Sequence, residues 1–207
     1  REVILNNSHL KATGCSHSGL MLDPINITLN SSEVEVTNNA TTDYGFGLAC
    51  YDGIVTLNSS TITATGNGGD SSSFGVFAGK LDVDGNSTLN ASDNGGSGLG
   101  VGGKSWIRSG ANVICDRNGY HDAGAGGGLH VFSWFSEDEH GEYTIPEYVG
   151  DLTIERNATV SVCDNVGLSG IQNSWILTIE DGAHVTVDRN TRFGIFNSLD
   201  AQLTIEG

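Results

Sequence analysis

The sequence predicts an all-β solenoid, a chain that winds in stacked coils around one apolar core, and three observations support this class. The phrase LTIE at 177–180 returns at 203–206, 26 residues later. Within that repeat, apolar and polar residues alternate with a period of two, which is typical of β-strands. Neither a long helical pattern nor a β-hairpin signal separates the alternating segments. Repeats of this kind bury their apolar residues by stacking on one another.

The repeat at 177–202 shows the expected elements of one coil in order. Apolar residues alternate with polar ones at 177–180, a turn follows at Asp181 and Gly182, and the alternation resumes at 185–187. A third alternating segment lies at 193–195. We therefore expect three short strands in each coil, with the apolar side chains pointing inward.

Alignment on the first apolar position of each coil gives a period close to 25 residues with one interruption. The aligned positions are Val3, Ile27, Val55, Leu81, Ser105, Leu152, Leu177 and Leu203. The step from Ser105 to Leu152 is longer than the others by roughly twenty residues. We predict a single domain over 1–207 with about seven coils, and a long loop insertion at 132–149.

One polar position recurs in register, three residues after the second inward residue of the second strand. It is occupied by Asn39, Asn67, Asn94, Asn118, Asn165 and Asn190, with Cys15 in the first coil. Asparagine tolerates left-handed backbone at a bend, and its amide can donate and accept at once. We predict a buried ladder of asparagines that are hydrogen-bonded from coil to coil. A glycine follows each of them, just before the third strand.

The phrase at 177–195 reads apolar-x-apolar, Gly-Ala, Val-x-Val, Asp-Arg-Asn, Gly-Ile. It resembles the repeats of the right-handed parallel β-helix superfamily, the pectate-lyase-like fold, and most closely those of bacterial surface adhesins and autotransporter-type passenger segments. The resemblance implies a right-handed coil that serves as a stalk or binding surface outside the cell. It is specific for the fold, but the same fold hosts many activities.

The charge balance limits the partners. The chain has a formal net charge of −16, with 9 Lys and Arg against 25 Asp and Glu. Such a chain is not expected to bind nucleic acid or an anionic membrane surface. No run of 18 apolar residues is present, so no membrane-spanning segment is predicted. Cations, glycans and other proteins remain as partners.

The insertion is the expected ligand-binding site, because long loops in compact repeats are usually functional. Its aromatic rings could fold it onto the solenoid wall and contact a sugar, and its acids could bind Ca²⁺ through oxygen ligands. The predicted ligand-binding residues are Trp134, Phe135, Glu137, Asp138, Glu139, Glu142, Tyr143 and Tyr148, with Trp106 on the first-strand face. Calcium would be held by Glu137, Asp138 and Glu139, and no other cofactor is expected. The alternative is a loop without a ligand, in which the acidic residues are exposed to solvent and the aromatic residues pack on the solenoid.

An enzyme is the second class, because polysaccharide lyases and glycoside hydrolases share this architecture. Hydrolysis needs two carboxylates, and a lyase of the pectate type pairs acids with a basic residue. Asp82, Asp84 and Arg108 lie next to Trp106 in the outward rows and would be the catalytic residues. Few Lys and Arg are available to bind an acidic polysaccharide, so a non-catalytic module is preferred.

Two structural expectations complete the prediction. Asp93, Arg117, Asp164 and Arg189 precede the ladder asparagines in successive coils and should form a cross-coil charge ladder. The four cysteines lack the spacing of a metal site and should be free and mostly buried.

The sequence starts and stops within a coil, without an amphipathic cap. We therefore expect a segment of a longer solenoid or a unit that associates end to end. A structural fibre or stalk subunit is the minor alternative. The preferred function is an extracellular, secreted or surface-attached, adhesin-like module that binds glycans or proteins.

Overall fold

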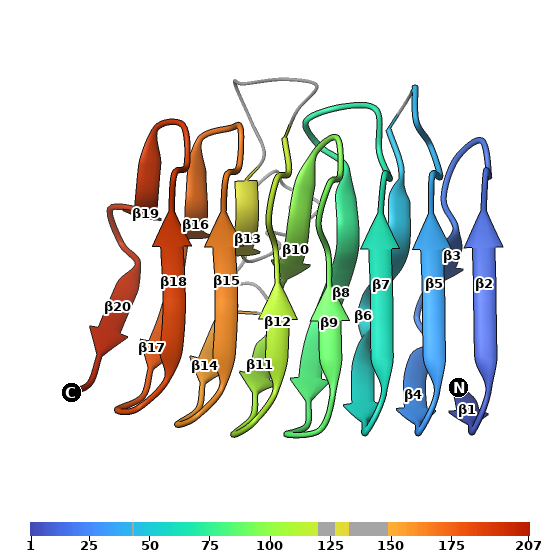
Figure 1. The fold of residues 1–207 in the computed structure, drawn as a ribbon, viewed down its shortest axis with the longest axis horizontal. Coiled ribbons are helices and arrows are strands. Elements are labelled where there is room, and N and C mark those ends of the chain that lie inside the picture. The colour runs from blue at the N-terminus through green and yellow to red at the C-terminus, as the bar shows by residue number, and fades with distance from the viewer. Residues whose placement is uncertain (43, 120–126, 133–148) are drawn as a thin grey trace, which may run out of the picture.

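The computed structural model describes residues 1–42, 44–119, 127–132 and 149–207. These residues form a parallel β-solenoid of about seven turns, and no helix occurs among them. Figure 1 shows the coils side by side along the longest axis, with the two termini at opposite ends of the stack. Accordingly, the described chain contains no helix of the length and apolarity needed to cross a membrane.

The second strands form a seven-stranded sheet of their own, which faces the viewer in Figure 1. Its strands are β2 (His9–Thr13), β5 (Glu33–Thr37), β7 (Thr61–Thr65), β9 (Thr88–Asn90), β12 (Asn112–Ile114), β15 (Thr159–Cys163) and β18 (His184–Asp188). All of its pairings are parallel, and the inward residues of one strand lie opposite those of the next.

The first and third strands of the coils belong to one 13-stranded sheet. First strands are β1 (Glu2–Asn6), β4 (Asn26–Asn30), β11 (Lys104–Ile107), β14 (Asp151–Ile154), β17 (Ile176–Ile179) and β20 (Gln202–Ile205). Third strands are β3 (Leu20–Leu22), β10 (Ser97–Val101), β13 (Gly127–Val131), β16 (Ser169–Asn173) and β19 (Phe193–Asn197).

Two long strands join these rows, which differs from the expectation of three separate short strands in every coil. β6 (Phe46–Asn58) and β8 (Phe74–Val83) each run from the third strand of one coil into the first strand of the next. The corner is taken within the strand, because the register of β6 with β8 shifts between Cys50 and Ile54. A β-bulge bends a strand without ending it.

The core contains the inward residues that the alignment predicted. Val3 pairs with Ile27 and Ile27 with Val55, and the predicted register continues through the later coils. In the middle coils these side chains are fully buried. In the first and last described coils they are only partly buried, because these coils have a neighbour on one side only.

The asparagine ladder is confirmed. Asn118 and Asn165 are buried, and Asn118 Nδ2 donates to Asn165 Oδ1 at 3.1 Å. The same oxygen accepts the Asn118 backbone N–H at 2.9 Å, so one carbonyl satisfies two donors of the neighbouring coil. This pattern repeats at each step from Asn39 to Asn190. The ladder thus pairs both backbone and side-chain groups at a buried bend.

The left-handed residue at this bend is not the ladder asparagine, contrary to expectation, but the residue before it. Positive φ angles occur at Asn38 (55°), Asp93 (57°), Arg117 (56°), Asp164 (58°) and Arg189 (50°). The ladder asparagines have ordinary φ angles, which leaves their side chains directed into the coil. The bend and the ladder therefore depend on two consecutive residues.

In six coils a glycine at the start of the third strand, or just before it in the case of Gly19, makes room for the ladder. A Cβ added to Gly75 would lie 2.4 Å from Asn94 Nδ2, and one added to Gly47 would lie 2.7 Å from Asn67 Nδ2. Comparable contacts, between 2.4 and 2.8 Å, occur at Gly19, Gly98, Gly128 and Gly170. Real Cβ atoms do not approach other atoms so closely. A side chain at any of these glycines would therefore displace the neighbouring ladder asparagine.

A serine ladder, which was not predicted, supports the turn between the first and second strands. Ser32 Oγ accepts the backbone N–H of Ser8, and Ser60 Oγ accepts that of Ser32, each at 3.0 Å. Ser87 Oγ does the same for Ser60. These small side chains pair turn amides that would otherwise be unsatisfied.

Candidate functional site

Arg108 and Asp82 are in direct contact on the first-strand face. Arg108, which directly follows β11, donates through Nε to Asp82 Oδ1 at 2.7 Å and through Nη2 to Asp82 Oδ2 at 2.8 Å. Its Nη1 reaches Glu155 Oε1 in the next coil at 3.1 Å. The hydrogen bonds to Asp82 raise the pKa of Arg108, and they outweigh the opposing effect of burial. The three residues form one ion-pair network across three coils.

Asp84, the third candidate for catalysis, stabilises a turn. Its Oδ1 accepts from Ser87 Oγ at 2.6 Å and from the backbone N–H of Asn86 at 3.1 Å, and the backbone N–H of Ser59 also donates to this carboxylate. Burial raises the pKa of Asp84, but these hydrogen bonds together lower it further than burial raises it. Asp84 is therefore held as an ionised turn acceptor and does not join Asp82 and Arg108.

Trp106 lies between cationic neighbours. Lys104 Nζ is 5.5 Å from the centroid of its ring, and Arg108 Cζ is 5.1 Å from it. Both distances fall within the range of cation–π contacts. Its register partners are Asp82 and Thr153, so the ring covers neighbouring side chains on the sheet. A sugar that stacked here would have to share the ring with these cations.

An aromatic cluster lies apart from the main apolar core, on the third-strand part of the 13-stranded sheet. Phe77 is at its centre, with ring centroids 5.8 Å from Phe46, 5.3 Å from Phe74 and 4.9 Å from Phe132. Phe46 and Phe77 are buried, with 1% and 2% of their surface exposed. A Cβ at Gly100 would lie under 3 Å from the rings of Phe74 and Phe132, so this glycine leaves room for them.

His130 belongs to the same cluster. Its ring centroid is 5.1 Å from that of Phe132 and 6.4 Å from that of Phe74. Burial lowers the pKa of His130 to about 4, because charging the imidazole among apolar rings is unfavourable. The ring is consequently neutral near pH 7.

The predicted binding residues of the insertion lie outside the described residues. These are Trp134, Phe135, Glu137, Asp138, Glu139, Glu142, Tyr143 and Tyr148, and with them the proposed calcium ligands. What is described is the residue from which the insertion departs: Phe132 follows β13 and packs on Phe77. Phe132, the last described residue before 133–148, thus belongs to the aromatic cluster.

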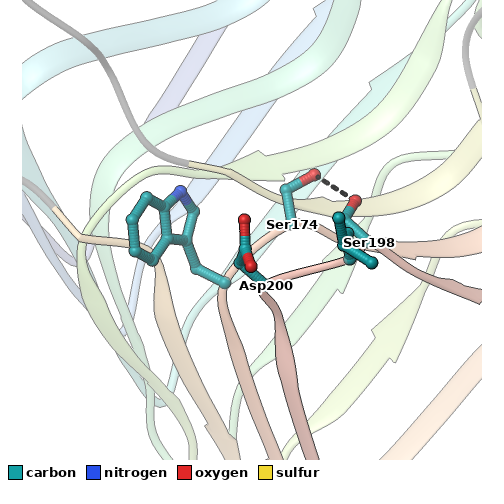
Figure 2. A pocket seen from close by; sticks show the side chains of 5 residues that line it. Ser174, Ser198 and Asp200 are labelled. Carbon is teal, nitrogen blue, oxygen red and sulfur yellow. Dashed lines mark hydrogen bonds between the residues drawn. The ribbon is translucent and has the colours of Figure 1, made fainter. Parts of the chain in front are cut away.

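A hollow of about 420 Å³ lies at the corner between third and first strands near the end of the described chain. It is lined by Ser174, Trp175, Ser198, Leu199 and Asp200. Ser198 Oγ donates to Ser174 Oγ at 3.4 Å, as Figure 2 shows. This combination of an indole, a carboxylate and hydroxyls was not predicted, although Trp175 is one of only 3 tryptophans.

Two pairs of the expected charge ladder are in direct contact, and the charge of Arg117 also acts on Asp164 in the next coil. Arg117 Nε donates to Asp93 Oδ1, and Arg189 Nε to Asp164 Oδ1, both at 2.7 Å. These side chains are exposed, so the pairs favour register more than they add stability.

The cysteines agree with expectation, because all four are free and only Cys15 is exposed. Burial raises the pKa of Cys50 to about 11, so its thiol stays protonated near pH 7. The buried cysteines act as small apolar residues.

Comparisons of the chain with protein-family models, with curated proteins and with solved structures found no match. The functional assignment of this parallel β-solenoid therefore rests on its own residues and their geometry.

Proposed function

We propose that the protein is an extracellular, adhesin-like binding module of the pectate-lyase-like β-helix type, which binds a glycan or a protein without catalysis. The observation that carries the proposal is the aromatic cluster around Phe77. Elsewhere the outward positions hold mainly Thr, Asn and charged residues, as in the row Thr28, Thr56 and Asp82. A rigid set of rings at the root of a long loop is a suitable foundation for a binding surface.

The hollow at Trp175 supports a glycan as the preferred ligand. Sugar rings stack their C–H faces on indoles, and their hydroxyls bond to carboxylates and serines. Trp175, Asp200, Ser174 and Ser198 supply these groups within one concave site. A glycan long enough to contact more than one coil could use this hollow together with the insertion.

The contacts of the acidic candidates favour binding over catalysis. Asp82 is engaged by Arg108 at both carboxylate oxygens, and Asp84 by the turn. A general acid or base needs a carboxylate that can turn toward the substrate, and these hydrogen bonds hold Asp82 against Arg108 and Asp84 against the turn. A polysaccharide lyase or glycoside hydrolase remains the alternative.

A printed glycan array with the full chain tests this proposal. We expect saturable binding that is lost in a Trp134→Ala/Phe135→Ala variant and weakened in Trp175→Ala. The matched control is Trp106→Ala, which removes an indole from the cation-flanked position and should retain binding. Circular dichroism and the unfolding midpoint check that each variant is folded. Equal binding by all three variants would contradict the proposed surfaces, and an array without a ligand would favour protein partners.

A further inference from the structure

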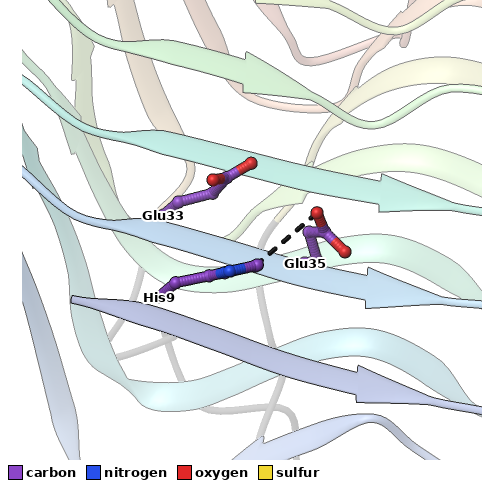
Figure 3. Close-up of side chains that lie close together, drawn as sticks. All are labelled: His9, Glu33 and Glu35. Carbon is purple, nitrogen blue, oxygen red and sulfur yellow. Dashed lines mark ion pairs between the residues drawn. The ribbon is translucent and has the colours of Figure 1, made fainter.

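The outer face of the seven-stranded sheet brings three metal-ligating side chains together. β2 and β5 pair in parallel, with His9 opposite Glu33 and Lys11 opposite Glu35. Side chains two residues apart in a strand share a face, so Glu33 and Glu35 both lie beside His9. One ligand atom from each of these three residues lies within 4.8 Å of the other two. Figure 3 shows His9 on one strand and both glutamates on its neighbour.

One pair of these atoms already has the spacing of two ligands of a tetrahedral zinc ion. His9 Nε2 is 3.5 Å from Glu35 Oε1. Two ligands that are each about 2.1 Å from a tetrahedral Zn²⁺ are about 3.4 Å apart. His9 and Glu35 thus already have the required separation, and Glu33, an exposed side chain, can complete the set by rotating its carboxylate. We infer that His9, Glu33 and Glu35 form a three-ligand Zn²⁺ site with water as the fourth ligand.

The donor set selects zinc over the hard cations. Imidazole nitrogen and carboxylate oxygen are both zinc ligands, whereas Ca²⁺ takes six to eight oxygen ligands. Mg²⁺ likewise prefers oxygen and retains much of its water. Two carboxylates and a neutral imidazole also balance the charge of the ion. Copper and nickel bind the same donors, and selection among these metals depends on coordination geometry and on which metal is available.

Lys11 would compete with the metal ion for the carboxylate of Glu35. Its ammonium group pairs with Glu35, and this hydrogen bond is the main reason that the pKa of Glu35 is lowered. A zinc ion bound to Glu35 would be repelled by the adjacent ammonium group. Removal of the Lys11 charge should therefore tighten zinc binding.

The site would couple two coils. His9 comes from β2 and both carboxylates from β5, so the ion would bridge neighbouring strands. A ligand that binds only the folded state raises stability by RT ln(1 + L/Kd), where L is the free ligand concentration. Zinc should then raise the unfolding midpoint of the protein.

The test is a zinc titration of the full chain in competition with a chromophoric chelator. Cys15→Ser is the background, because Cys15 is an exposed thiol that could bind zinc by itself. Zinc affinity should fall at least tenfold in His9→Ala and in Glu33→Gln, and it should rise in Lys11→Met. The matched control is His184→Ala, from β18 at the far end of the same sheet, where the opposite residue is Thr159. This control should keep the affinity of the background protein.

Each outcome decides the proposal. Loss of the tightest zinc equivalent in both the His9 and the Glu33 variant, with tighter binding in Lys11→Met, supports it. The same affinity with and without His9, or no binding to the background protein, overturns it. Weaker binding in Lys11→Met excludes Glu35 as a ligand, and displacement of zinc by equimolar Mg²⁺ would show an unspecific acidic surface. Both results overturn the three-ligand site.

Discussion

Truncation of Asn94 tests the ladder where its contacts are most completely described. Asn94 Oδ1 accepts the backbone N–H of Asn67 at 3.0 Å and Asn67 Nδ2 at 3.1 Å. Asn94 Nδ2 donates to the backbone oxygens of Ala64 and Ser92 and to Asn118 Oδ1. The side chain is fully buried, so water cannot replace these partners.

The expected cost of Asn94→Ala follows from these contacts. The buried N–H of Asn67 loses its acceptor, which costs about 1 to 3 kcal/mol. Asn67 Nδ2 keeps the Val36 oxygen at 2.8 Å, and Asn118 Oδ1 keeps the Asn94 backbone N–H at 3.0 Å, so each loses only one bond, worth about 1 kcal/mol. These hydrogen bonds belong to one network, so their individual losses do not add in full. We expect the free energy of unfolding to fall by about 3 kcal/mol.

Urea unfolding, monitored by circular dichroism, measures this change. The matched control is Asn112→Ala in β12, which removes an outward asparagine from the seven-stranded sheet and should change the free energy of unfolding by less than about 0.5 kcal/mol. If Asn94→Ala cost no more than Asn112→Ala, the ladder would not be a source of stability, and the reasoning would be refuted.

Three further predictions concern Gly75, His130 and Arg117. Gly75→Ala should destabilise the protein strongly, because the new Cβ would meet the side-chain amide of Asn94. The loss should be smaller in an Asn94→Ala background, where that amide is absent. If the two substitutions lowered the free energy of unfolding additively in urea, this explanation would be contradicted. The folded-state pKa of His130, about 4, is below the unfolded value of about 6.5, so the unfolded state binds more protons between these pH values. The free energy of unfolding should therefore fall as the pH is lowered from 6.5 to 4, by at most about 1.4 kcal/mol per pH unit. His130→Gln should reduce this slope, and an unchanged slope would show that His130 does not cause it. Arg117→Gly should change the free energy of unfolding by less than about 1 kcal/mol, because glycine at a φ of 56° offsets the lost exposed pair with Asp93, and a larger loss would show that the pair matters.

Inward and outward positions could be predicted from the sequence because they depend on a local period of two. The register from Ile27 to Val55 and the ladder through Asn118 and Asn165 required only that the coils stack with equivalent residues in line. This one assumption was enough to predict the core and the burial of the ladder, whereas the role of the glycines became clear only from their contacts with the ladder amides.

Contacts that run diagonally between coils could not be predicted in this way. Arg108 is aligned with Asp84 in the row, yet its side chain reaches Asp82, because the turn donors of Ser59, Asn86 and Ser87 already hold Asp84. The approach of His9 to Glu35 is also diagonal. Such contacts depend on rotamers and on competing partners, and the period of the sequence carries no information about either.

The central functional claim, binding without turnover, is tested most directly by the fate of a bound glycan. The protein would be incubated with the best glycan of the array, with and without calcium, and the glycan would be recovered and its mass measured. The account predicts saturable retention of a glycan that is recovered intact. Shortened chains, or unsaturated products of a lyase reaction, that disappear in an Asp82→Asn/Arg108→Gln variant would contradict it.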